Sequence, residues 1–584
     1  MASKLEAYKG AAAPIPSEQW AWQLFGAGMD RFGIDGKPVR VPVAEPGLGE
    51  LLLRVDACGL CFSDIKIINL GGDHPRLAGR DLQQNPVIPG HEASLTVVKV
   101  GPGLENRYHV GDRFIVQADI RYKGKGVAFG YALPGALQQY VLVGDEVLRG
   151  DDGCYLLPVQ PTTGHAEAGL AEPWACVERS YRVTYRDGIK HEGAALFLGA
   201  DRGAPQPVKL SWGIEPESYP STIVIDKSLS TKVRRFISEQ AEATDAEVAE
   251  VFGADLPALA AKFSDGAGFD DIVVIGAPAP SVVESAAKVL APGGVLNIVA
   301  AEPMTGPVQI DVGRIHYDGL QIVGTMQSDI AAGYKRSRTS ELRTGGSAWF
   351  VGAGGPMGQM HVLRAAEMAE GPRVIVGSDI DAERLAVVHD RFAPAAEARG
   401  ARLICLNPTE LGPERFDAAL REACGGDGFD DVCILAPVPA LMEAAMSWLA
   451  PNGIMNIFAG VAKGTMATLD LNPVCRRGVR FVGTSGSQIA DLQYTLSKAE
   501  SGKLSTNASV AAIGGIEATY EGLEGVRSGQ FLGKVVIFPQ LQDLPLTALT
   551  ELPERLPAVA AKLKDGKTWT RDAEAELFDE KLPD

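Results

Sequence analysis

Four residues in the first third of the chain have side chains of the types that bind metal ions. Cys61 lies in the stretch DACGLCFSDIK, His91 and Glu92 follow in NPVIPGHE, and Glu172 lies in GLAEPW. Zinc accepts cysteine, histidine and carboxylate ligands, and three protein ligands with an open fourth position define a catalytic zinc site. Singly, Cys61 also fits a small buried apolar residue, His91 a turn residue and Glu172 a surface carboxylate. Their combination favours a catalytic metal site.

A second set of residues has the pattern of a dinucleotide site. In SAWFVGAGGPMG an apolar strand runs into a glycine-rich turn, and a helix is predicted to follow. The glycines of this turn are Gly352, Gly354, Gly355 and Gly358. Glycines let the backbone approach a pyrophosphate, and the N-terminus of a helix offers N–H donors and the positive end of its dipole.

An acidic residue at the end of the next predicted strand completes this pattern. Asp379 follows Gly358 by 21 residues, where a carboxylate binds the ribose hydroxyls. Its charge repels a 2′-phosphate, so the sequence favours NAD over NADP. Arg384 lies nearby and keeps NADP open as an alternative.

The chain repeats itself across this region. GFDDIVVIGAPAP returns as GFDDVCILAPVP, and LAPGGVLNIVA returns as LAPNGIMNIFA. The spacing is 159 residues from Ala277 to Ala436 and again from Gly324 to Gly483. A constant spacing through apolar runs and turns predicts a duplicated domain, since solenoid repeats recur at shorter periods.

The first copy differs from the second at its loop. Asp201, Arg202 and Pro205 occupy the positions of three glycines, although Asp226 aligns with Asp379. A carboxylate at a helix N-terminus would fill the anion site, and proline lacks an N–H donor. We predict that the first copy keeps the fold but does not hold a dinucleotide in the usual way. It serves as a scaffold or dimerisation domain, or as a second ligand site for a nucleotide bound differently.

Composition limits the class of protein. The 584 residues suffice for three or four domains, and a net charge of −18 argues against nucleic acid or an anionic membrane as partner. Eight scattered cysteines suggest a reducing compartment. The N-terminus has no signal-peptide core and no apolar run is long enough to span a bilayer, so we expect a soluble, cytoplasmic protein.

The expected fold is α/β plus β. Residues 1–190 contain short alternating strands and Gly/Pro turns, typical of a compact β-rich domain. Residues 191–340 and 341–490 alternate strands with helices, as parallel βαβ units do. Strand-like segments return over 491–540, and 541–584 reads as an amphipathic helical tail.

These motifs resemble the zinc-dependent medium-chain dehydrogenase/reductases, the superfamily of alcohol and polyol dehydrogenases. The resemblance covers about residues 49–200 and 341–540, through CGLCFSD, PGHE, HVGDRFIV, AEP, the glycine loop and GKVVI. NPVIPGHE, YKGKGVAFGY and AEPWACVERSY look most like the polyol and sugar-phosphate branch, which includes L-sorbose 1-phosphate reductase. The resemblance implies a GroES-like catalytic domain at 1–190, completed by 491–540, and two tandem Rossmann-like doubly wound sheets.

The resemblance also implies roles for individual residues. Zinc would be held by Cys61, His91 and Glu172, with Glu92 able to exchange in or bind through water. Ser63 is placed like the family's hydroxyl relay and would accept the substrate proton. Lys66 would pass that proton to solvent, pair with a substrate phosphate, or be a plain surface lysine. No cysteine occurs from 111 to 153, so one catalytic zinc and no structural zinc are expected.

The expected function is hydride transfer between NAD(H) and a secondary alcohol or ketone of a polyol, sugar or sugar phosphate. A redox-neutral epimerase or lyase, which oxidises its substrate transiently on the same zinc site, is the alternative. A binding or structural protein that no longer catalyses is a further one. The expected partner is the small-molecule substrate, with neither nucleic acid nor membrane. A homo-oligomer is expected because symmetric assemblies are common.

Overall fold

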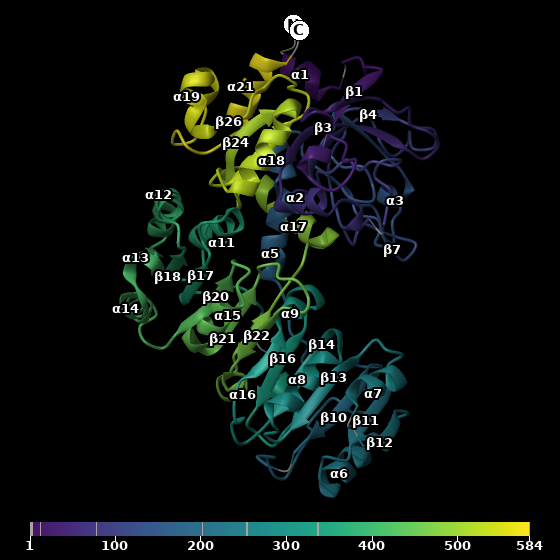
Figure 1. Cartoon of the computed structure of the whole chain (residues 1–584), viewed down its shortest axis with the longest axis vertical. Coiled ribbons are helices and arrows are strands. Elements are labelled where there is room, and N and C mark those ends of the chain that lie inside the picture. Colours follow the sequence, from purple (N-terminus) through teal and green to yellow (C-terminus); the bar gives the residue numbers. More distant parts are fainter. Residues whose placement is uncertain are drawn as a thin grey trace. The chain divides into compact units, whose positions relative to one another are not determined.

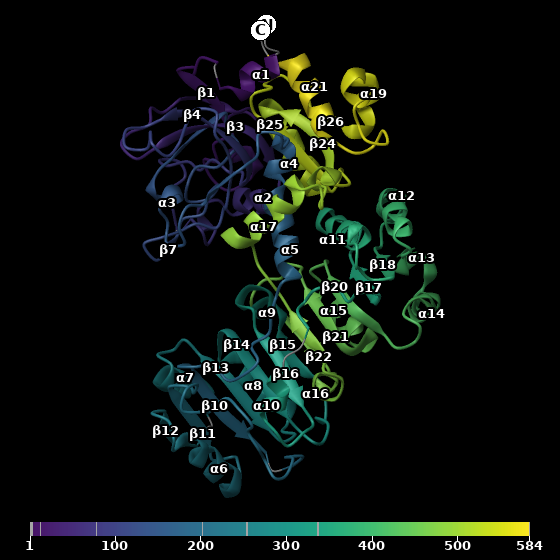
Figure 2. The same ribbon diagram turned by 180° about the vertical axis from the view of Figure 1, so that it is seen from behind.

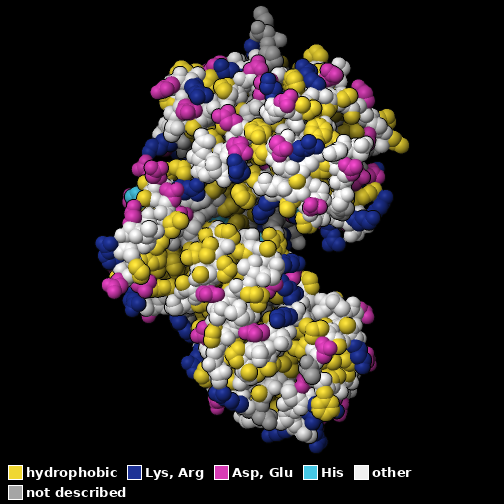
Figure 3. Space-filling model, in the orientation of Figure 1, with side chains coloured by type: hydrophobic (Ala, Val, Ile, Leu, Met, Phe, Trp, Pro, Cys, Tyr) yellow, Lys and Arg dark blue, Asp and Glu magenta, His cyan; other side chains and the backbone are white. Residues whose placement is uncertain are grey.

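The computed structural model describes residues 4–11, 13–77, 79–200, 202–252, 255–335 and 338–582. The chain forms two compact units, one made of Met1–Glu178 with Gly486–Asp584 and the other of Arg179–Ser485 (Figures 1 and 2). Acidic and basic side chains are interspersed on the face shown in Figure 3. No helix in the described ranges has the length and apolar composition that a bilayer crossing requires.

The first unit is built on an eight-stranded sheet. Its strand order is β26-β24-β25-β3-β4-β5-β9, and β8 also pairs with β3. The bounds are β3 Leu51–Gly59, β4 Glu92–Val100, β5 Arg113–Val116, β8 Tyr140–Val143, β9 Leu156–Pro158, β24 Val510–Gly515, β25 Lys534–Phe538 and β26 Thr547–Ala548. β3 and β4 are antiparallel with Gly59 opposite Glu92. The C-terminal end of β3 and the N-terminal end of β4 therefore lie side by side within the sheet.

Short helices follow these strands and position the residues that the sequence singles out. They are α2 Phe62–Leu70, α4 His165–Gly169, α5 Ala171–Ser180, α17 Ile489–Glu500 and α18 Thr519–Ser528. The last two fall largely where strand-like segments are expected; α17 buries Leu492, Leu496 and Ala499 on one face, which is helical periodicity. In the C-terminal segment, α19 Leu552–Arg555, α20 Pro557–Ala560 and α21 Arg571–Lys581 share a core with α1 Lys4–Lys9.

The second unit contains two six-stranded sheets in which every strand pairing is parallel. Counted along the chain, both have the strand order third, second, first, fourth, fifth, sixth. The first sheet consists of β12 Glu247–Val251, β11 Thr222–Asp226, β10 Ala194–Gly199, β13 Phe269–Ile275, β14 Leu290–Val299 and β16 Gln321–Thr325. The second consists of β19 Arg402–Leu406, β18 Val374–Ser378, β17 Ser347–Val351, β20 Phe429–Ile434, β21 Leu449–Ile457 and β23 Arg480–Val482.

The helices around the two sheets differ at one place. In the second region, α11 Pro356–Glu367 connects β17 to β18. In the first region no helix occurs among the described residues 202–221, between β10 and β11. The expected helix after the first loop is therefore absent; Asp201 lies outside the described residues. Pro205 and Pro207, which cannot donate backbone hydrogen bonds, lie in this segment.

The remaining helices recur at similar places in both regions. The first region has α6 Thr231–Ala241, α7 Leu256–Phe263, α8 Pro280–Lys288, α9 Val312–Asp318 and α10 Ala331–Tyr334. The second has α12 Ala382–Ala398, α13 Pro408–Leu411, α14 Pro413–Ala423, α15 Pro439–Ala445 and α16 Asn472–Arg477. A two-stranded ribbon, β15 Val308–Asp311 with β22 Met466–Leu469, joins the two regions.

Candidate functional site

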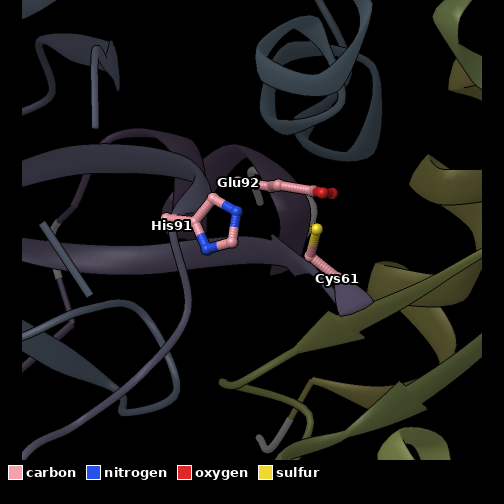
Figure 4. Close-up of side chains that lie close together, drawn as sticks. All are labelled: Cys61, His91 and Glu92. Atoms are coloured by element: carbon pink, nitrogen blue, oxygen red, sulfur yellow. The ribbon is translucent and has the colours of Figure 1, made fainter. Parts of the chain in front are cut away.

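Three of the candidate ligands, Cys61, His91 and Glu92, lie together where β3 ends and β4 begins. Their ligand atoms all lie within 4.8 Å of one another, and Figure 4 shows the three side chains converging. His91 and Glu92 are buried and Cys61 is half-buried. Cys61 and His91 are 30 positions apart in the sequence, and they meet because the end of β3 is paired with the start of the antiparallel strand β4.

Asp64, which the sequence interpretation missed, fixes the orientation of two of these residues. Its Oδ2 accepts the N–H of Cys61 at 2.9 Å, and its Oδ1 lies 3.3 Å from Nδ1 of His91. A carboxylate beside one imidazole nitrogen leaves the other nitrogen for a ligand position. The signal in the sequence is an aspartate at the third position of a helix that begins after Cys61, as in a capping box.

Glu92 is held by a lysine from a distant strand. Nζ of Lys534, the first residue of β25, donates to Oε1 of Glu92 at 2.5 Å and to the carbonyl of Leu60 at 2.8 Å. Burial opposes the charge of Lys534 most strongly, but Glu92, Cys61 and Asp64 together outweigh it and raise the lysine pKa. Oε2 of Glu92 is buried and has no hydrogen-bond partner.

An unpartnered buried carboxylate oxygen beside a thiol and an imidazole fits a cation. Buried polar atoms are nearly always paired, and S, N and O donors together are a ligand set that zinc accepts. Gly59 leaves the necessary room, since a Cβ there would lie 2.1 Å from Oε2 of Glu92. Among the described residues, no other group of three or more such side chains brings its ligand atoms within 4.8 Å of one another.

Glu172 lies near this group but is not part of it. It sits on α5, and its ligand atoms are not within the 4.8 Å set. Burial raises the pKa of Glu172 to about 7; the charge of His91 opposes this, and those of Glu92 and Asp119 add to it. A nearby cation would restore its negative charge. One helical turn later, burial and then Glu172 raise the pKa of the Cys176 thiol well above its usual value.

Ser63 and Lys66 both lie on α2, one helical turn apart. Ser63 is half-buried beside the metal-binding group, and Lys66 is exposed to solvent. Residues three apart share a face of a helix. Burial, then Arg76, then Lys66 lower the pKa of His74, so these three basic side chains form one cluster.

Arg76 links this basic cluster to the metal-binding group. Its guanidinium lies 4.8 Å from the centre of the Tyr131 ring, and that ring centre lies 5.8 Å from the ring of His91. Arg76 also donates to Asp119 at 2.5 Å. The pKa of Arg76 is raised: burial opposes its charge, but Asp119 and, more weakly, Glu172 favour it.

In the second unit, the glycine-rich loop runs from β17 into α11. Gly352 has a φ of 87°, which favours glycine. Gly358 lies against the strand, since a Cβ there would come within 2.4 Å of the Gly352 carbonyl. Gly355 caps α11, and a Cβ at this position meets no atom within 4 Å. The loop is thus open on the side where a ligand would approach the helix.

Asp379 closes this loop from the end of β18. Its Oδ2 accepts the N–H of Gly354 at 2.9 Å, and its Oδ1 accepts the N–H of Asp381 at 3.1 Å. Nε of Arg384 lies 3.2 Å from Oδ2 of Asp381. Ile380, which the sequence interpretation missed, is 75% exposed directly beside Asp379. The sequence shows only that an apolar residue follows Asp379, and the structure adds that this residue is exposed.

The comparisons with known proteins agree with this geometry. Residues 47–149 match the family model of the alcohol dehydrogenase GroES-like domain. The chain is 30% identical over 296 residues to the uncharacterized protein YggP of Escherichia coli, covering 47% of this chain and 68% of that protein. This chain belongs to the zinc-dependent medium-chain dehydrogenase/reductase superfamily. The resemblance noted in the sequence is confirmed, and the dehydrogenase is an oxidoreductase.

This dehydrogenase is also similar to a curated reductase in sequence and to a solved alcohol dehydrogenase in structure. It is 28% identical over 291 residues to the L-sorbose 1-phosphate reductase of Klebsiella pneumoniae, covering 47% of this chain and 69% of that protein. The crystal structure of an alcohol dehydrogenase from Thermotoga maritima matches with a TM-score of 0.50 at 13% identity, over 89% of this chain and 99% of that one. The structural match supports the β-rich domain with a parallel-sheet domain.

Proposed function

We propose that the dehydrogenase uses zinc and NAD to transfer a hydride between the cofactor and a secondary alcohol or ketone of a polyol or sugar phosphate. The observation that carries this proposal is the buried, unpartnered carboxylate oxygen of Glu92 beside Cys61 and His91. Lys534 pairs with the other oxygen, so the free oxygen is an open ligand position beside a thiol and an imidazole, which a metal cation would fill. The oxidoreductase superfamily then limits the chemistry that such a cation serves.

Cys61, His91 and Glu92, whose ligand atoms already lie together, would hold the zinc, and Glu172, nearby on α5, would be able to exchange with Glu92. When bound, zinc supplies a Lewis acid that makes a substrate hydroxyl more acidic or a carbonyl more electrophilic. Lys534 holds Glu92 through Oε1 and leaves Oε2 for the exchange. Ser63 would accept the substrate proton at Oγ while giving up its own hydroxyl proton, and Lys66, one turn away and exposed, would pass a proton to solvent.

The second-unit loop would hold NAD, whose nicotinamide accepts or returns the hydride. The backbone at Gly355 would take the pyrophosphate at the N-terminus of α11. Asp379 would accept hydrogen bonds from the adenosine ribose, and the exposed Ile380 would offer an apolar contact to the adenine. Arg384 pairs with Asp381, which supports NAD rather than NADP.

We also propose that residues 191–340 and 341–490 are two copies of one Rossmann-like domain. The constant spacing in sequence and the shared strand order of the two sheets support this. Only the second copy would bind a nucleotide, because the described residues 202–221 of the first copy contain no helix whose N-terminus could take the pyrophosphate. The described cysteines are all free, which supports a cytoplasmic location.

The basic cluster around Arg76 supports a phosphorylated substrate. A phosphate needs cationic donors, and a guanidinium binds it through two hydrogen bonds. Arg76 and His74 lie next to Tyr131, whose ring lies 5.8 Å from that of His91. A sugar phosphate with its hydroxyl at the metal would thus reach these groups. The similarity to L-sorbose 1-phosphate reductase agrees with this substrate class.

Metal analysis and titration with NADH test the central proposal. We expect one zinc per chain, lost in Cys61→Ser, and one NADH site per chain, lost in Gly355→Asp. Net formation of NADH from a polyol phosphate is expected with the zinc-loaded protein. Tightly held NAD that turns over without net NADH would instead favour an epimerase or lyase. Zinc-free, inactive protein after purification with zinc present would contradict the proposal.

Arg76→Gln tests the substrate class separately. We expect kcat/KM for a sugar phosphate to fall about 100-fold, the equivalent of roughly 2.7 kcal/mol, while an unphosphorylated polyol is turned over as before. Arg107→Gln is the matched control, because Arg107 stacks on Tyr108 beyond the other end of β4. Equal losses for both kinds of substrate would assign Arg76 a structural role.

A further inference from the structure

The ribbon that joins the two sheets of the second unit has a symmetric register. β15 and β22 pair antiparallel, with Val308 opposite Leu469 and Ile310 opposite Ala467. With the 159-residue spacing, Val308 corresponds to Ala467 and Ile310 to Leu469. The two pairs are therefore one contact made twice, with the partners exchanged.

Gln309 and Thr468 lie at the centre of this arrangement. They are opposite each other in the ribbon and are separated by 159 residues, so each corresponds to the other. Nε2 of Gln309 donates to Oγ1 of Thr468 at 2.7 Å. A pair of this kind lies on a pseudo-two-fold axis, as in an isologous contact between identical subunits.

Two hydrogen bonds outside the ribbon are related in the same way: each becomes the other when the two regions are interchanged. Nδ1 of His316, on α9, lies 3.1 Å from the carbonyl oxygen of Ile457. Sγ of Cys475, on α16, lies 3.5 Å from the carbonyl oxygen of Ile298. His316 corresponds to Cys475 and Ile298 to Ile457 at the spacing of 159. Different side chains thus make equivalent contacts in the two directions.

Two glycines at equivalent positions repeat this relationship. A Cβ at Gly324, in β16, would lie 2.7 Å from Sγ of Cys475. A Cβ at Gly483, just after β23, would lie 2.7 Å from Cα of His316. Each glycine gives room to the helix of the other region. The close approach of helix and strand is therefore built in both directions.

These contacts cover the last strand of each sheet and share one core. β16 and β23 are the edge strands of their sheets, and they contact each other. One apolar cluster continues through both regions, with Val308, Ile310, Val312, Ile315, Ala467, Leu469, Leu471 and Val474 on its two sides. Unpaired edge strands are sites of association with other chains, and here each edge is covered by the other.

We infer that residues 191–340 are a built-in partner, which occupies the place that a second chain would take against the nucleotide-binding region. This inference rests on the two regions being copies of one domain. The first copy has kept the contact surface, β15, α9 and β16, but lacks the helix after β10 that a nucleotide needs. The homo-oligomer expected from the sequence would therefore not form through the edge strand β23, because β16 of the same chain already covers that strand.

A disulfide across the axis tests this inference in the full-length protein. Gln309→Cys with Thr468→Cys places two thiols on directly opposite residues, both accessible at the surface of the ribbon. Opposite residues in a ribbon are close enough for a disulfide. Under mild oxidation we expect most molecules to form this bond within one chain, seen as a monomer on a denaturing non-reducing gel and as a linked peptide by mass spectrometry.

The controls separate this result from other cysteine chemistry. The single variants Gln309→Cys and Thr468→Cys should not form the bond, and Gln309→Cys with Met466→Cys, which is out of register, should form it at least tenfold more slowly. A covalent species of twice the chain mass would show that the edges pair between chains and would overturn the inference. Failure of the opposite pair to bond in folded protein would overturn it too. Neither readout depends on zinc or NAD, so the proposed function is tested independently.

Discussion

At the scale of single residues, the site depends on a buried ion pair that comes from the two ends of the chain. Lys534 and Glu92 are 442 residues apart, and both side chains are almost fully buried. A buried charge is stable when paired and costly when its partner is removed. The pair therefore holds Glu92 in place whether or not a cation is present.

Lys534→Met should be strongly destabilising in metal-free protein. We expect the free energy of unfolding to fall by about 3–5 kcal/mol, because Glu92 is left as an unpaired buried carboxylate. Urea unfolding of chelator-treated protein measures this. The double variant Lys534→Met with Glu92→Gln should recover most of the loss; an equal loss in both would assign the effect to packing of the lysine stem.

The sequence was informative about some of these residues and silent about others. Cys61, His91 and Glu92 could be predicted because each lies in a short local motif, and the fold brings them together. Lys534 could not be predicted, because its partner is distant in the chain and pairing depends on tertiary structure. Gly59 was missed for the same reason: only the register of β3 and β4 shows what its missing side chain makes room for.

At the scale of elements, α11 and its loop distinguish the two parallel sheets. Parallel βαβ units could be predicted from the alternation of strand-like and helical stretches, whereas the order of the strands in each sheet comes from the structure. The absence of a helix among the described residues 202–221 could not be predicted, because Asp226 and Asp379 align at the same spacing as the two loops, which suggests equivalent structure in between. Pro205 and Pro207 lie in this segment, and proline breaks helices as well as lacking an N–H donor.

Two glycines of the loop should respond differently to the same substitution. In Gly358→Ala the new methyl group would lie 2.4 Å from the Gly352 carbonyl, so we expect a loss of about 1–3 kcal/mol in stability as well as weaker NADH binding. In Gly355→Ala there is open space and an ordinary φ of −70°, so stability should change little while NADH binding weakens. Thermal unfolding and NADH titration of both variants check this contrast.

A buried histidine on α11 makes stability depend on pH. Burial, with a contribution from Arg364, lowers the pKa of His361 to about 3, whereas a histidine in an unfolded chain titrates near 6.5. Between these values the unfolded state binds a proton that the folded state does not. Stability should therefore fall as the pH drops below about 6.5, by up to ~1.4 kcal/mol per pH unit from this group.

Urea unfolding at pH 6.5, 5.5 and 4.5 measures this slope. His361→Gln should reduce the slope, although it also loses the hydrogen bond with Tyr181 and so lowers stability at every pH. His109→Gln, at a side chain that is 72% exposed, should leave the slope unchanged. The same slope in all three proteins would show that His361 does not titrate between the two states as argued.

At the scale of the whole molecule, the apolar core that continues through both sheets couples their stabilities. Leu469 is fully buried opposite Val308, at the contact between the two regions. Leu469→Ala should therefore lower the free energy of local opening by about 2–5 kcal/mol in both sheets. Hydrogen exchange of peptides from β14 and β21 measures the two sheets separately.

Leu403→Ala provides the control for this experiment. Leu403 is buried in β19, the strand at the other edge of the second sheet, away from the ribbon. We expect this variant to reduce protection in the second sheet and to leave β14 unchanged. Loss of protection in β21 alone after Leu469→Ala would mean that the two regions open independently.

The ribbon between β15 and β22 also changes how this contact can vary. In an assembly of two identical chains, one codon specifies both sides of a two-fold contact, so every substitution there arises twice. Here each side has its own codon, and a substitution on one side can be met by a different residue on the other. Gln309 opposite Thr468, and His316 in the role that Cys475 has in the opposite direction, are pairings that no strictly symmetric dimer could encode.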